Sequence, residues 1–466
     1  PDRLYQADKH AEPFWQPNET GGHLNEDYFG GDLEGIRIKL PYLREMGVDY
    51  LYLNPIFETH SNHRYNTADY LNVDPLLGTN EEFEVLCREA AKYGIGIVLD
   101  GVFSHTGSDS RYFNREGRYG DGGAYRDPNS PYRSWYDFDP KYKGGYRSWW
   151  GFETLPEVNE ENPSYVEFIT GEGGVIDTWL RRGAAGFRLD VADELPDDFI
   201  EKIRAAVKRV SPEKFLLGEV WEDATTKYGF GQRRTYLLGK GLDSVMNYPF
   251  KNAVLDFVKG KPAEQAMGEI LSICEHYPAP AMDTALNFLS THDTERALTV
   301  IADEPANGRG REWQSGRCVT GDAYEEGMLK LRMAYAIIYT LPGVPCLYYG
   351  DEIGMQGYRD PFNRGFYCWD SHEERLKPVL AQLAQLRHTC EAFRTGELRV
   401  LRAEGGVLHY QRIGEFEAAE IIVNRTEHII VEPLASGKHT EVNPMGFTIV
   451  VEEVGHNPNH SYYDYK

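Results

Sequence analysis

Short apolar runs, bounded by Gly, Pro, Asn or Asp, recur along most of the chain. The runs are nearly continuous in apolar character, which is typical of strands that are buried on both faces. Longer segments between them, such as residues 81–94 and 197–210, carry apolar residues at helical spacing. Strand alternating with helix predicts a parallel sheet with right-handed crossovers. The predicted strands are residues 48–57, 94–103, 184–192, 214–221, 242–250, 285–293 and 344–352.

Polar or ionisable residues stand at the end of nearly every predicted strand. Groups that gather at the C-terminal ends of parallel strands are typical of the active site of a (β/α)8 TIM barrel. A doubly wound open sheet is the alternative, but it places its site at one switch point rather than on strand after strand. The pattern therefore favours the barrel. The residues in question are Asn54, Asp100, Asp190, Glu219, Asn247, His292, Asp293, Asp351 and Glu352.

One strand of the expected barrel is not found in the sequence. The segment 30–47 has the pattern of the helix that should follow the first strand, yet residues 1–29 contain no strand-like apolar run. We therefore expect the first barrel strand to lie N-terminal to Pro1. The native N-terminus and any targeting segment would then also precede this sequence.

Two changes of pattern divide the chain further. Residues 104–164 are rich in Tyr, Trp, Gly, Asp and Arg with little periodicity, which predicts a subdomain inserted after the third strand. After the barrel, expected over residues 1–390, short alternating segments predict a C-terminal antiparallel β-sandwich domain over 391–466. Its predicted strands are residues 397–404, 406–413, 418–424, 427–433 and 447–454.

The formal net charge of −24 argues against nucleic acid or an anionic membrane as a partner, because the chain would repel phosphates. The sequence contains no run of about 18 apolar residues, which is the length needed to span a membrane. The six cysteines are widely spaced, without metal-binding spacing, which is typical of free thiols in a reducing compartment. We expect a cytoplasmic protein, and the sequence predicts no particular oligomeric state.

Arg188 and Asp190 are opposite charges inside an apolar strand, and residues two apart in a strand face the same side. Both should point into the barrel mouth, where the guanidinium favours an ionised carboxylate. Glu219 ends the next strand and should approach Asp190, and crowding of like charges should favour its protonation. A pair such as Arg188 with Asp190 is by itself more often structural than catalytic. The convergence of ionisable groups from four strands favours catalysis.

Paired carboxylates in one cavity suit glycoside hydrolysis, in which one carboxylate attacks the anomeric carbon and the other protonates the leaving oxygen. In retaining enzymes the two carboxyl groups are about 5–5.5 Å apart. No metal-ligand spacing, phosphate-cradling Gly loop or Ser-His-Asp elbow competes with this interpretation.

Five sequence motifs resemble those of the α-amylase superfamily of glycoside hydrolases. They are DGVFSH (100–105), GFRLDVADE (186–194), GEVW (218–221), STHDTE (290–295) and GVPCLYYGDEIGM (343–355). Within this superfamily, the finer resemblance is to the neopullulanase, cyclomaltodextrinase and maltogenic amylase group. It rests on VADE, LPEVN (155–159) and DSVMNYPF (243–250).

The resemblance implies roles for individual residues. Asp190 would be the nucleophile, Glu219 the general acid/base, and Asp293 the residue that stabilises the distorted −1 sugar. Residues that would bind substrate surround that sugar or border the neighbouring subsites. They are Tyr65, which would stack on the −1 sugar, with Asp100, His105, Arg188 and His292 around it, Trp221 on the leaving side, Glu194 bordering the acceptor sites, and Asp360 and Arg364 on the next sugar inward.

The sequence also departs from the superfamily. Ser104 stands where amylases commonly carry a calcium-binding Asn, although Gly30 and Asp32 fit part of that site. We expect no cofactor to be required, with calcium as an open alternative. Glu157 replaces a Lys that is frequent in the group, which leaves substrate preference open. The N-terminal β-domain that commonly mediates dimers in the group is not seen.

These observations predict a retaining hydrolase of α-1,4 bonds in maltooligosaccharides, cyclodextrins or starch fragments, with transglycosylation as an additional activity. An α-glucosidase that releases single glucose units is the first alternative. A catalytically inactive carbohydrate-binding homologue is the second, and the intact Asp190, Glu219 and Asp293 argue against it.

Overall fold

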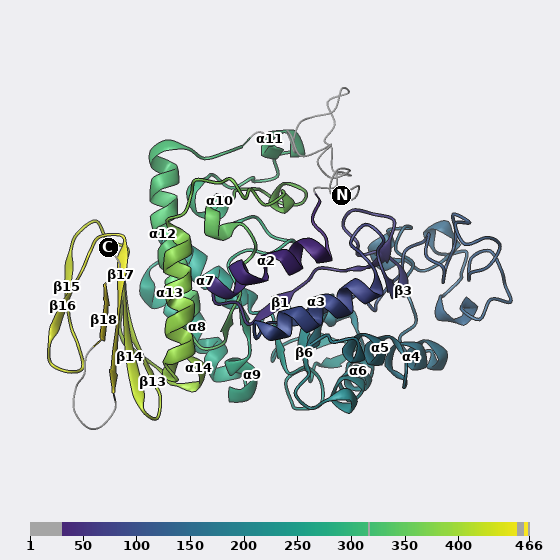
Figure 1. The fold of residues 1–466 in the computed structure, drawn as a ribbon, viewed down its shortest axis with the longest axis horizontal. Coiled ribbons are helices and arrows are strands. Elements are labelled where there is room, and N and C mark those ends of the chain that lie inside the picture. Colours follow the sequence, from purple (N-terminus) through teal and green to yellow (C-terminus); the bar gives the residue numbers. More distant parts are fainter. Residues whose placement is uncertain (1–29, 316, 454–460, 465–466) are drawn as a thin grey trace. The chain divides into compact units, whose positions relative to one another are not determined.

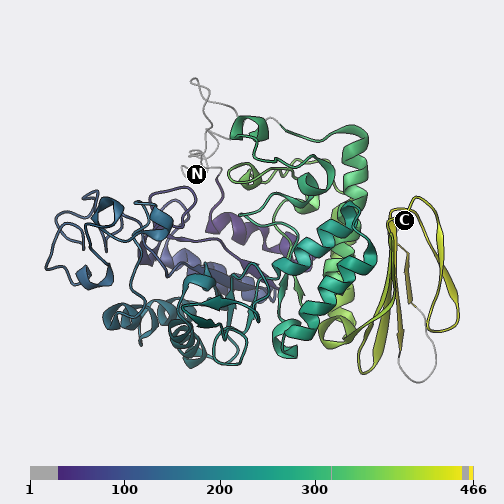
Figure 2. The same ribbon diagram turned by 180° about the vertical axis from the view of Figure 1, so that it is seen from behind.

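The computed structural model of the chain describes residues 30–315, 317–453 and 461–464. These residues fall into two compact units. The first comprises residues 30–220 and 224–245, and the second comprises residues 221–223, 246–315, 317–453 and 461–464. Figures 1 and 2 show the elements of both units from two sides.

The first unit is built on a five-stranded parallel sheet. Its strands follow the order β1-β4-β5-β6-β9. Four of these strands are almost entirely buried, which fits their continuous apolar sequence. The register pairs Asp100 with Arg188 and Leu189 with Gly218, so the polar ends of the strands lie together. The bounds are β1 (Tyr50–Tyr52), β4 (Gly96–Gly101), β5 (Gly186–Leu189), β6 (Phe215–Gly218) and β9 (Ser244–Val245).

The helices of this unit begin where the sequence supplies caps. Thr79 and Glu82 form a capping box at the start of α3, and Asp32 caps α2 by accepting the N–H of Gly35. The apolar residues of α6 recur at three- and four-residue spacing and are buried. Both predicted amphipathic helices are confirmed. The bounds are α2 (Leu33–Glu45), α3 (Asn80–Lys92), α4 (Pro163–Thr170), α5 (Val175–Arg181) and α6 (Asp197–Val210).

The predicted strand 48–57 is shorter in the structure than its sequence suggested. Strand β1 ends at Tyr52, and Phe57 instead opens an antiparallel hairpin of β2 (Phe57–Thr59) and β3 (Thr67–Val73). A proline at position 55 cannot donate a ladder hydrogen bond, and this explains the interruption between the two strands.

The aperiodic segment 104–164 carries little regular structure. Before α4 begins at Pro163, it contains the short turns η1 (Arg133–Trp135), η2 (Lys143–Gly145) and η3 (Trp149–Gly151) and isolated β-bridges such as that between His105 and Glu157. Buried aromatic rings hold it together, among them Phe113, which packs against Tyr136 and Tyr146 at centroid distances of 4.8 and 4.6 Å. Later in the unit are η4 (Ala192–Glu194) and the hairpin of β7 (Tyr228–Gly229) and β8 (Gln232–Arg233).

The second unit contains a parallel pair, β10 (Leu286–Asn287) and β11 (Val344–Pro345), and Met246 forms a parallel bridge to Leu286. The strands predicted at 242–250, 285–293 and 344–352 are therefore shorter than expected. In the first case the reason is local, because the side chain of Asn247 accepts the N–H of Phe250 and starts a helix. The helices are α7 (Tyr248–Lys259), α8 (Ala263–His276), α9 (Ala279–Asp283), α10 (Ala297–Ala302), α11 (Arg311–Ser315), α12 (Gly321–Thr340), α13 (Leu376–Thr389) and α14 (Ala392–Thr395), with the short turns η5 (Asp351–Ile353) and η6 (Phe362–Arg364).

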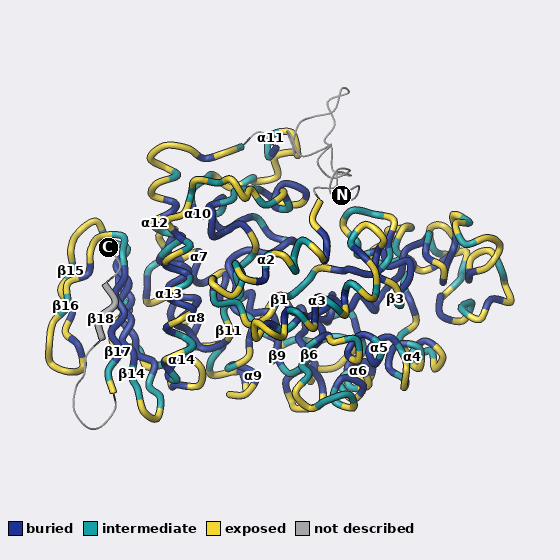
Figure 3. The backbone as a smooth tube through the Cα atoms, viewed as in Figure 1, coloured by how far each residue is buried: buried dark blue, intermediate teal, exposed yellow. Residues whose placement is uncertain are grey.

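The C-terminal part of this unit is the predicted antiparallel domain. Its five-stranded sheet has the order β12-β13-β14-β17-β18, and β15 and β16 form a second, smaller sheet. Strands β14 and β17 are buried over most of their length (Figure 3). The bounds are β12 (Glu397–Glu404), β13 (Val407–Ile413), β14 (Glu417–Asn424), β15 (Ile430–Pro433), β16 (His439–Val442), β17 (Gly446–Glu453) and β18 (Ser461–Asp464).

Strand and helix thus alternate through both units in the order of a (β/α)8 barrel, followed by an antiparallel β-domain. The expectation that the first barrel strand precedes Pro1 concerns the segment 1–29, which lies outside the described residues. The limits 1–390, 104–164 and 391–466 stay predictions. Among the described residues, no helix is both long and apolar enough to cross a membrane.

Candidate active site

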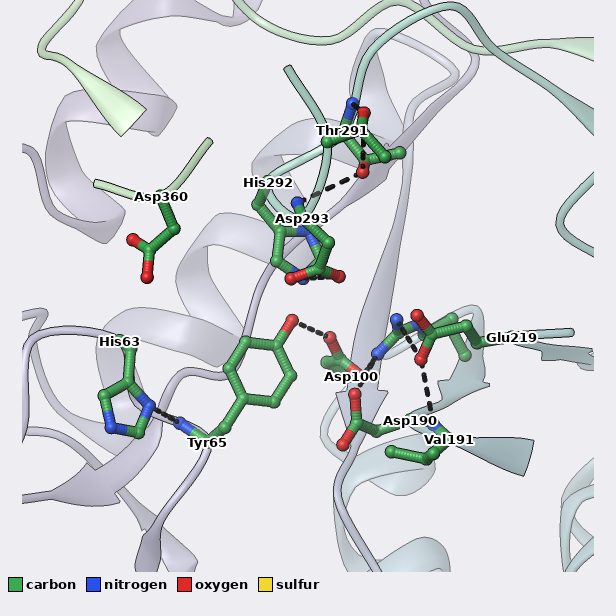
Figure 4. Close-up of polar contacts among 12 residues, drawn as sticks. His63, Tyr65, Asp100, Asp190, Val191, Glu219, Thr291, His292, Asp293 and Asp360 are labelled. Carbon is green, nitrogen blue, oxygen red and sulfur yellow. Dashed lines mark hydrogen bonds and ion pairs between the residues drawn. The ribbon is translucent and has the colours of Figure 1, made fainter. Parts of the chain in front are cut away.

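Arg188 lies at the centre of a carboxylate cluster in the first unit. Its Nη1 is 2.7 Å from Asp100 Oδ1 and 2.8 Å from Asp190 Oδ1, and its Nη2 is 2.8 Å from Glu219 Oε2. The three acidic residues stand at the ends of the neighbouring strands β4, β5 and β6. All four residues are buried. The expected convergence of strand-end groups is therefore observed in this unit (Figure 4).

The guanidinium of Arg188 stays positively charged although it is fully buried. Burial acts against the charge of Arg188, but the carboxylates of Asp100 and Glu219 outweigh it and raise the pKa of the guanidinium well above its ordinary value. The guanidinium fork can serve several oxygens at once because its donors have a fixed planar geometry. Arg188 therefore orients three carboxylates with one side chain.

Two tyrosines complete the cluster around Asp100. The hydroxyl groups of Tyr52 and Tyr65 donate to Asp100 Oδ2 at 2.7 and 2.9 Å. Burial is the largest cause that raises the pKa of both phenols well above the ordinary value. The charge of Asp100 raises the pKa as well, whereas the charge of Arg188 opposes the shift, and both phenols stay protonated donors. Tyr65 was expected from the sequence and Tyr52 was missed. The sequence does indicate Tyr52, because it stands two residues before the polar strand end at Asn54 and residues two apart in a strand face the same side.

His105 lies beside this cluster with both ring nitrogens engaged. Its Nε2 donates to the carbonyl oxygen of Tyr65 at 2.9 Å, and its Nδ1 lies 2.9 Å from the Ser104 hydroxyl. Because a carbonyl can only accept, the proton is assigned to Nε2. Burial lowers the pKa of His105 to about 4, so the ring is neutral near pH 7.

The residue after Asp190 helps to hold Glu219. The backbone N–H of Val191 donates to Glu219 Oε2 at 2.9 Å. Val191 has a φ of 45° and a ψ of 50°, a left-handed conformation that a β-branched residue rarely adopts. Such conformations cost about 1–3 kcal/mol and persist where the surroundings impose them. The chain therefore turns sharply between Asp190 and Glu194.

The second unit brings together the other expected polar residues. His292 Nε2 lies 2.9 Å from Asp293 Oδ2, and Arg364 Nη2 lies 3.4 Å from Asp293 Oδ1. Arg364 also donates from Nε to the carbonyl of His292 at 2.9 Å and pairs with Asp360 at 3.3 Å. The backbone N–H of Asp293 donates to the hydroxyl of Thr291 at 3.1 Å (Figure 4). Asp293 is thus oriented by three neighbours.

Two further expected residues have aromatic neighbours. Trp221 stacks on Tyr248 with a centroid distance of 4.4 Å and an interplanar angle of 13°, and it is 46% exposed. Glu194 accepts the indole N–H groups of Trp149 and Trp150. Neither tryptophan was singled out from the sequence, because no local pattern links residues 44 and 45 positions apart.

The described residues were compared with the geometry that a bound metal ion requires. In the described ranges, no group of three or more His, Cys, Asp or Glu side chains is arranged to hold a metal ion. Asp32, which fitted part of the calcium pattern, accepts the backbone N–H of Gly35 at 2.8 Å and caps helix α2.

Comparison with known proteins identifies the family. The family model described as "Alpha amylase, catalytic domain" matches residues 1–385. An amylopullulanase of Thermoanaerobacterium saccharolyticum is 37% identical over 423 residues, which cover 84% of this chain and 32% of that protein. A cyclomaltodextrinase of Geobacillus thermopakistaniensis is 32% identical over 419 residues, covering 87% of this chain and 64% of that protein. The chain therefore spans about a third of the length of this amylopullulanase.

Solved structures of glycoside hydrolases also match the fold of this chain. The ligand-free cyclic α-maltosyl-(1→6)-maltose hydrolase of Arthrobacter globiformis matches with a TM-score of 0.80 and 28% identity, covering 92% of this chain and 91% of that one. The acarbose-soaked debranching enzyme of Nostoc punctiforme matches with a TM-score of 0.75 and 29% identity, covering 90% and 89%. This chain belongs to the α-amylase catalytic-domain family of glycoside hydrolases and is similar within it to the cyclomaltodextrinase and neopullulanase group.

Proposed function

We propose that this chain is an α-glucan hydrolase that cleaves α-1,4 bonds with retention of anomeric configuration. The observation that carries the proposal is the shared guanidinium of Arg188, which holds Asp190 and Glu219 at the ends of neighbouring strands. Retaining hydrolysis needs two carboxyl groups close together, one as nucleophile and one as acid/base. Family membership supports the same chemistry.

In the proposed mechanism Asp190 is the nucleophile. Arg188 lies 2.8 Å from its Oδ1 and favours the ionised form that attack on the anomeric carbon requires. The attack forms a glycosyl ester on Asp190 while the bond to the leaving oxygen breaks. Water then cleaves the ester and releases the sugar with its original configuration.

Glu219 is the proposed general acid/base. Its Oε2 lies 2.8 Å from Arg188 Nη2 and accepts the backbone N–H of Val191, so neither neighbour can take up a proton from it. A proton delivered to the leaving oxygen would therefore be carried on Oε1. After departure of the leaving group, the same carboxylate would take a proton from the attacking water.

Asp293 is the proposed stabiliser of the −1 sugar. His292 and Arg364 fix both of its oxygens, so that it can grip sugar hydroxyl groups in one geometry. Tyr65, Asp100, His105 and His292 are proposed neighbours of that sugar. Trp221 is proposed to face the leaving side, Asp360 and Arg364 the next sugar inward, and Glu194 the acceptor side.

The proposed substrates are maltooligosaccharides, cyclodextrins and starch fragments. Related proteins carry names that refer to cyclomaltodextrin, maltose units and pullulan, so bond preference within α-glucans is part of the test. No cofactor is proposed. Transglycosylation is proposed as a side activity, in which a second sugar replaces water in the cleavage of the ester.

The experiment is product analysis after incubation with maltotriose, β-cyclodextrin, soluble starch and pullulan. Proton NMR in the first minutes reports the anomeric configuration of the new reducing end. Release of α-anomeric maltooligosaccharides supports the proposal, whereas β-anomeric products would overturn the retaining mechanism. Glucose as sole product would favour the α-glucosidase alternative, and binding without turnover would favour the inactive homologue.

A further inference from the structure

Two aromatic residues of the turn at 149–152 are unusually exposed. Trp150 is 77% exposed and Phe152 is 58% exposed, although both side chains are large and apolar. Trp150 also has a φ of 48° and a ψ of 24°, a left-handed backbone conformation that costs a bulky residue stability. Exposed rings on a strained turn do not contribute to the core, and exposed apolar surface of this kind is typical of a binding site.

Glu194 holds this turn through both of its carboxylate oxygens. Trp149 Nε1 donates to Oε2 at 2.5 Å and Trp150 Nε1 donates to Oε1 at 2.7 Å. Hydrogen bonds to an ionised acceptor are shorter and about twice as strong as those between neutral groups. The N–H edges of both indoles are therefore turned toward Glu194, which fixes the direction of the ring faces.

Glu194 itself belongs to a firmly anchored segment. Arg234 donates to the carbonyl of Asp193 at 2.6 Å and to the carbonyl of Leu195 at 2.5 Å. The hydroxyl of Tyr236 donates to the side chain of Asp193 at 2.8 Å. The backbone on both sides of Glu194 is held, so its carboxylate is a fixed point for the two indoles.

The rings connect this turn to the carboxylate cluster. Trp149 lies 5.6 Å from the ring of His105, tilted by 34°, and stacks on Phe152 at 6.1 Å and 26°. His105 in turn bonds to the backbone of Tyr65, whose hydroxyl reaches Asp100. Two hydrogen bonds and then two ring contacts therefore connect Asp100 in the cluster with Phe152 in the turn.

We propose that Trp149, Trp150 and Phe152 form a carbohydrate-binding platform and that Glu194 is the positioning residue that fixes it. The ligand would be a neutral α-glucan chain, because aliphatic sugar faces pack on apolar rings and the net charge of −24 disfavours anions. Glu194 then influences substrate through the two indoles rather than by touching the sugar. The inference rests on the proposed function for its ligand, since the same glucan chain would extend from the cluster.

The first test measures binding of maltohexaose by isothermal titration calorimetry, in the Asp190→Asn background so that no turnover intervenes. Trp150→Ala should weaken binding about tenfold, the equivalent of one lost ring contact. Phe416→Ala, which removes a 63% exposed ring from the turn between β13 and β14, is the matched control and should leave binding unchanged. Unchanged binding in Trp150→Ala would overturn the platform. If Trp150→Ala does not fold, Trp150→Phe replaces it, because phenylalanine keeps a ring but loses the N–H. This variant should weaken binding measurably but less than tenfold, and unchanged binding would again overturn the platform.

The second test separates positioning from direct contact. Glu194→Ala is measured in the Asp190→Asn background and again in the same background with Trp149→Phe and Trp150→Phe, which leaves no indole N–H for Glu194 to hold. If Glu194 acts through the indoles, its loss should weaken binding severalfold in the first chain and have no further effect in the second. An equal loss in both chains would show direct sugar contact and overturn the positioning role.

The two proposals can fail separately. Glucan binding that depends on Trp150, in a chain that hydrolyses no glucan, would reject the proposed function and support the platform. Hydrolysis of glucans with maltohexaose binding insensitive to Trp150 would support the proposed function and reject the platform.

Discussion

Asp190 and Glu219 are held by the two ends of one guanidinium, each with an oxygen 2.8 Å from Arg188. This relationship ties the proposed nucleophile and the proposed acid/base to a single buried cation. It also explains why an apolar strand carries two opposite charges.

Asp190→Asn should abolish hydrolysis without unfolding the chain. Asparagine keeps the size of the side chain and can still accept from Arg188 through its amide oxygen, but it cannot attack the anomeric carbon. We expect turnover of maltotriose to fall by about 10³-fold or more. Circular dichroism and the thermal midpoint provide the folding control. Turnover within tenfold of the unchanged chain would rule out Asp190 as the nucleophile.

Arg188→Met should destabilise the chain as well as inactivate it. It leaves the carboxylates of Asp100, Asp190 and Glu219 buried around a site without its cation. Removing one partner of a buried ion pair costs about 3–5 kcal/mol of unfolding free energy. The urea midpoint and kcat are the measurements.

The matched control for this change is Arg37→Met. Arg37 pairs with Glu34 at 2.7 Å, a distance similar to those around Arg188, but both side chains are exposed. Water screens such a pair, so its loss should leave the urea midpoint unchanged. Equal midpoints for Arg188→Met and the unchanged chain would show that the buried cluster does not stabilise the fold.

Much of the barrel was predictable because its information is local. Helix α6 occupies the predicted residues 197–210, since its apolar spacing is regular over four turns. Arg188 and Asp190 could be placed on one face from the two-residue period of a strand alone. Their partners Asp100 and Glu219 followed from the rule that parallel strands end at one edge.

The parts that were missed depend on distant contacts. Nothing in the neighbourhood of Glu194 indicates that its carboxylate accepts from Trp149 and Trp150, because the turn that carries them has no periodic pattern. The left-handed backbone of Val191 is likewise imposed from outside, since a β-branched residue does not favour it. The ends of the short strands also depend on tertiary context, as the early start of α7 at Tyr248 shows.

The buried His105 should make stability depend on pH. Its pKa is lowered to about 4, whereas an unfolded histidine titrates near 6.5. Between these values the unfolded chain binds more protons, so the free energy of unfolding rises with pH. The contribution is present above about pH 6.5 and is lost as the pH falls toward 4.

His105→Gln provides the measurement, because glutamine can donate to the carbonyl of Tyr65 but does not titrate. Unfolding free energies at pH 7.0 and 4.5 are compared for both chains. The decrease on acidification should be larger in the unchanged chain, by about 2–3 kcal/mol. Parallel decreases would contradict a neutral, buried imidazole at position 105.

Asp293→Asn should reduce kcat far more than it weakens substrate binding. Asp293 is fixed by His292 Nε2 at 2.9 Å and by Arg364 at 3.4 Å, so asparagine can keep the position of the side chain while losing its charge. A charge that stabilises mainly the distorted sugar acts in the transition state, and its removal should lower kcat by about 10²–10³-fold.

The control is Asp360→Asn, because Asp360 also pairs with Arg364 at 3.3 Å but is proposed to contact only the next sugar. It should raise KM with little change in kcat, since binding at that sugar contributes equally to ground state and transition state. Steady-state kinetics on maltohexaose distinguish the two patterns. Similar losses of kcat in both variants would mean that Asp293 acts only by holding Arg364 in place.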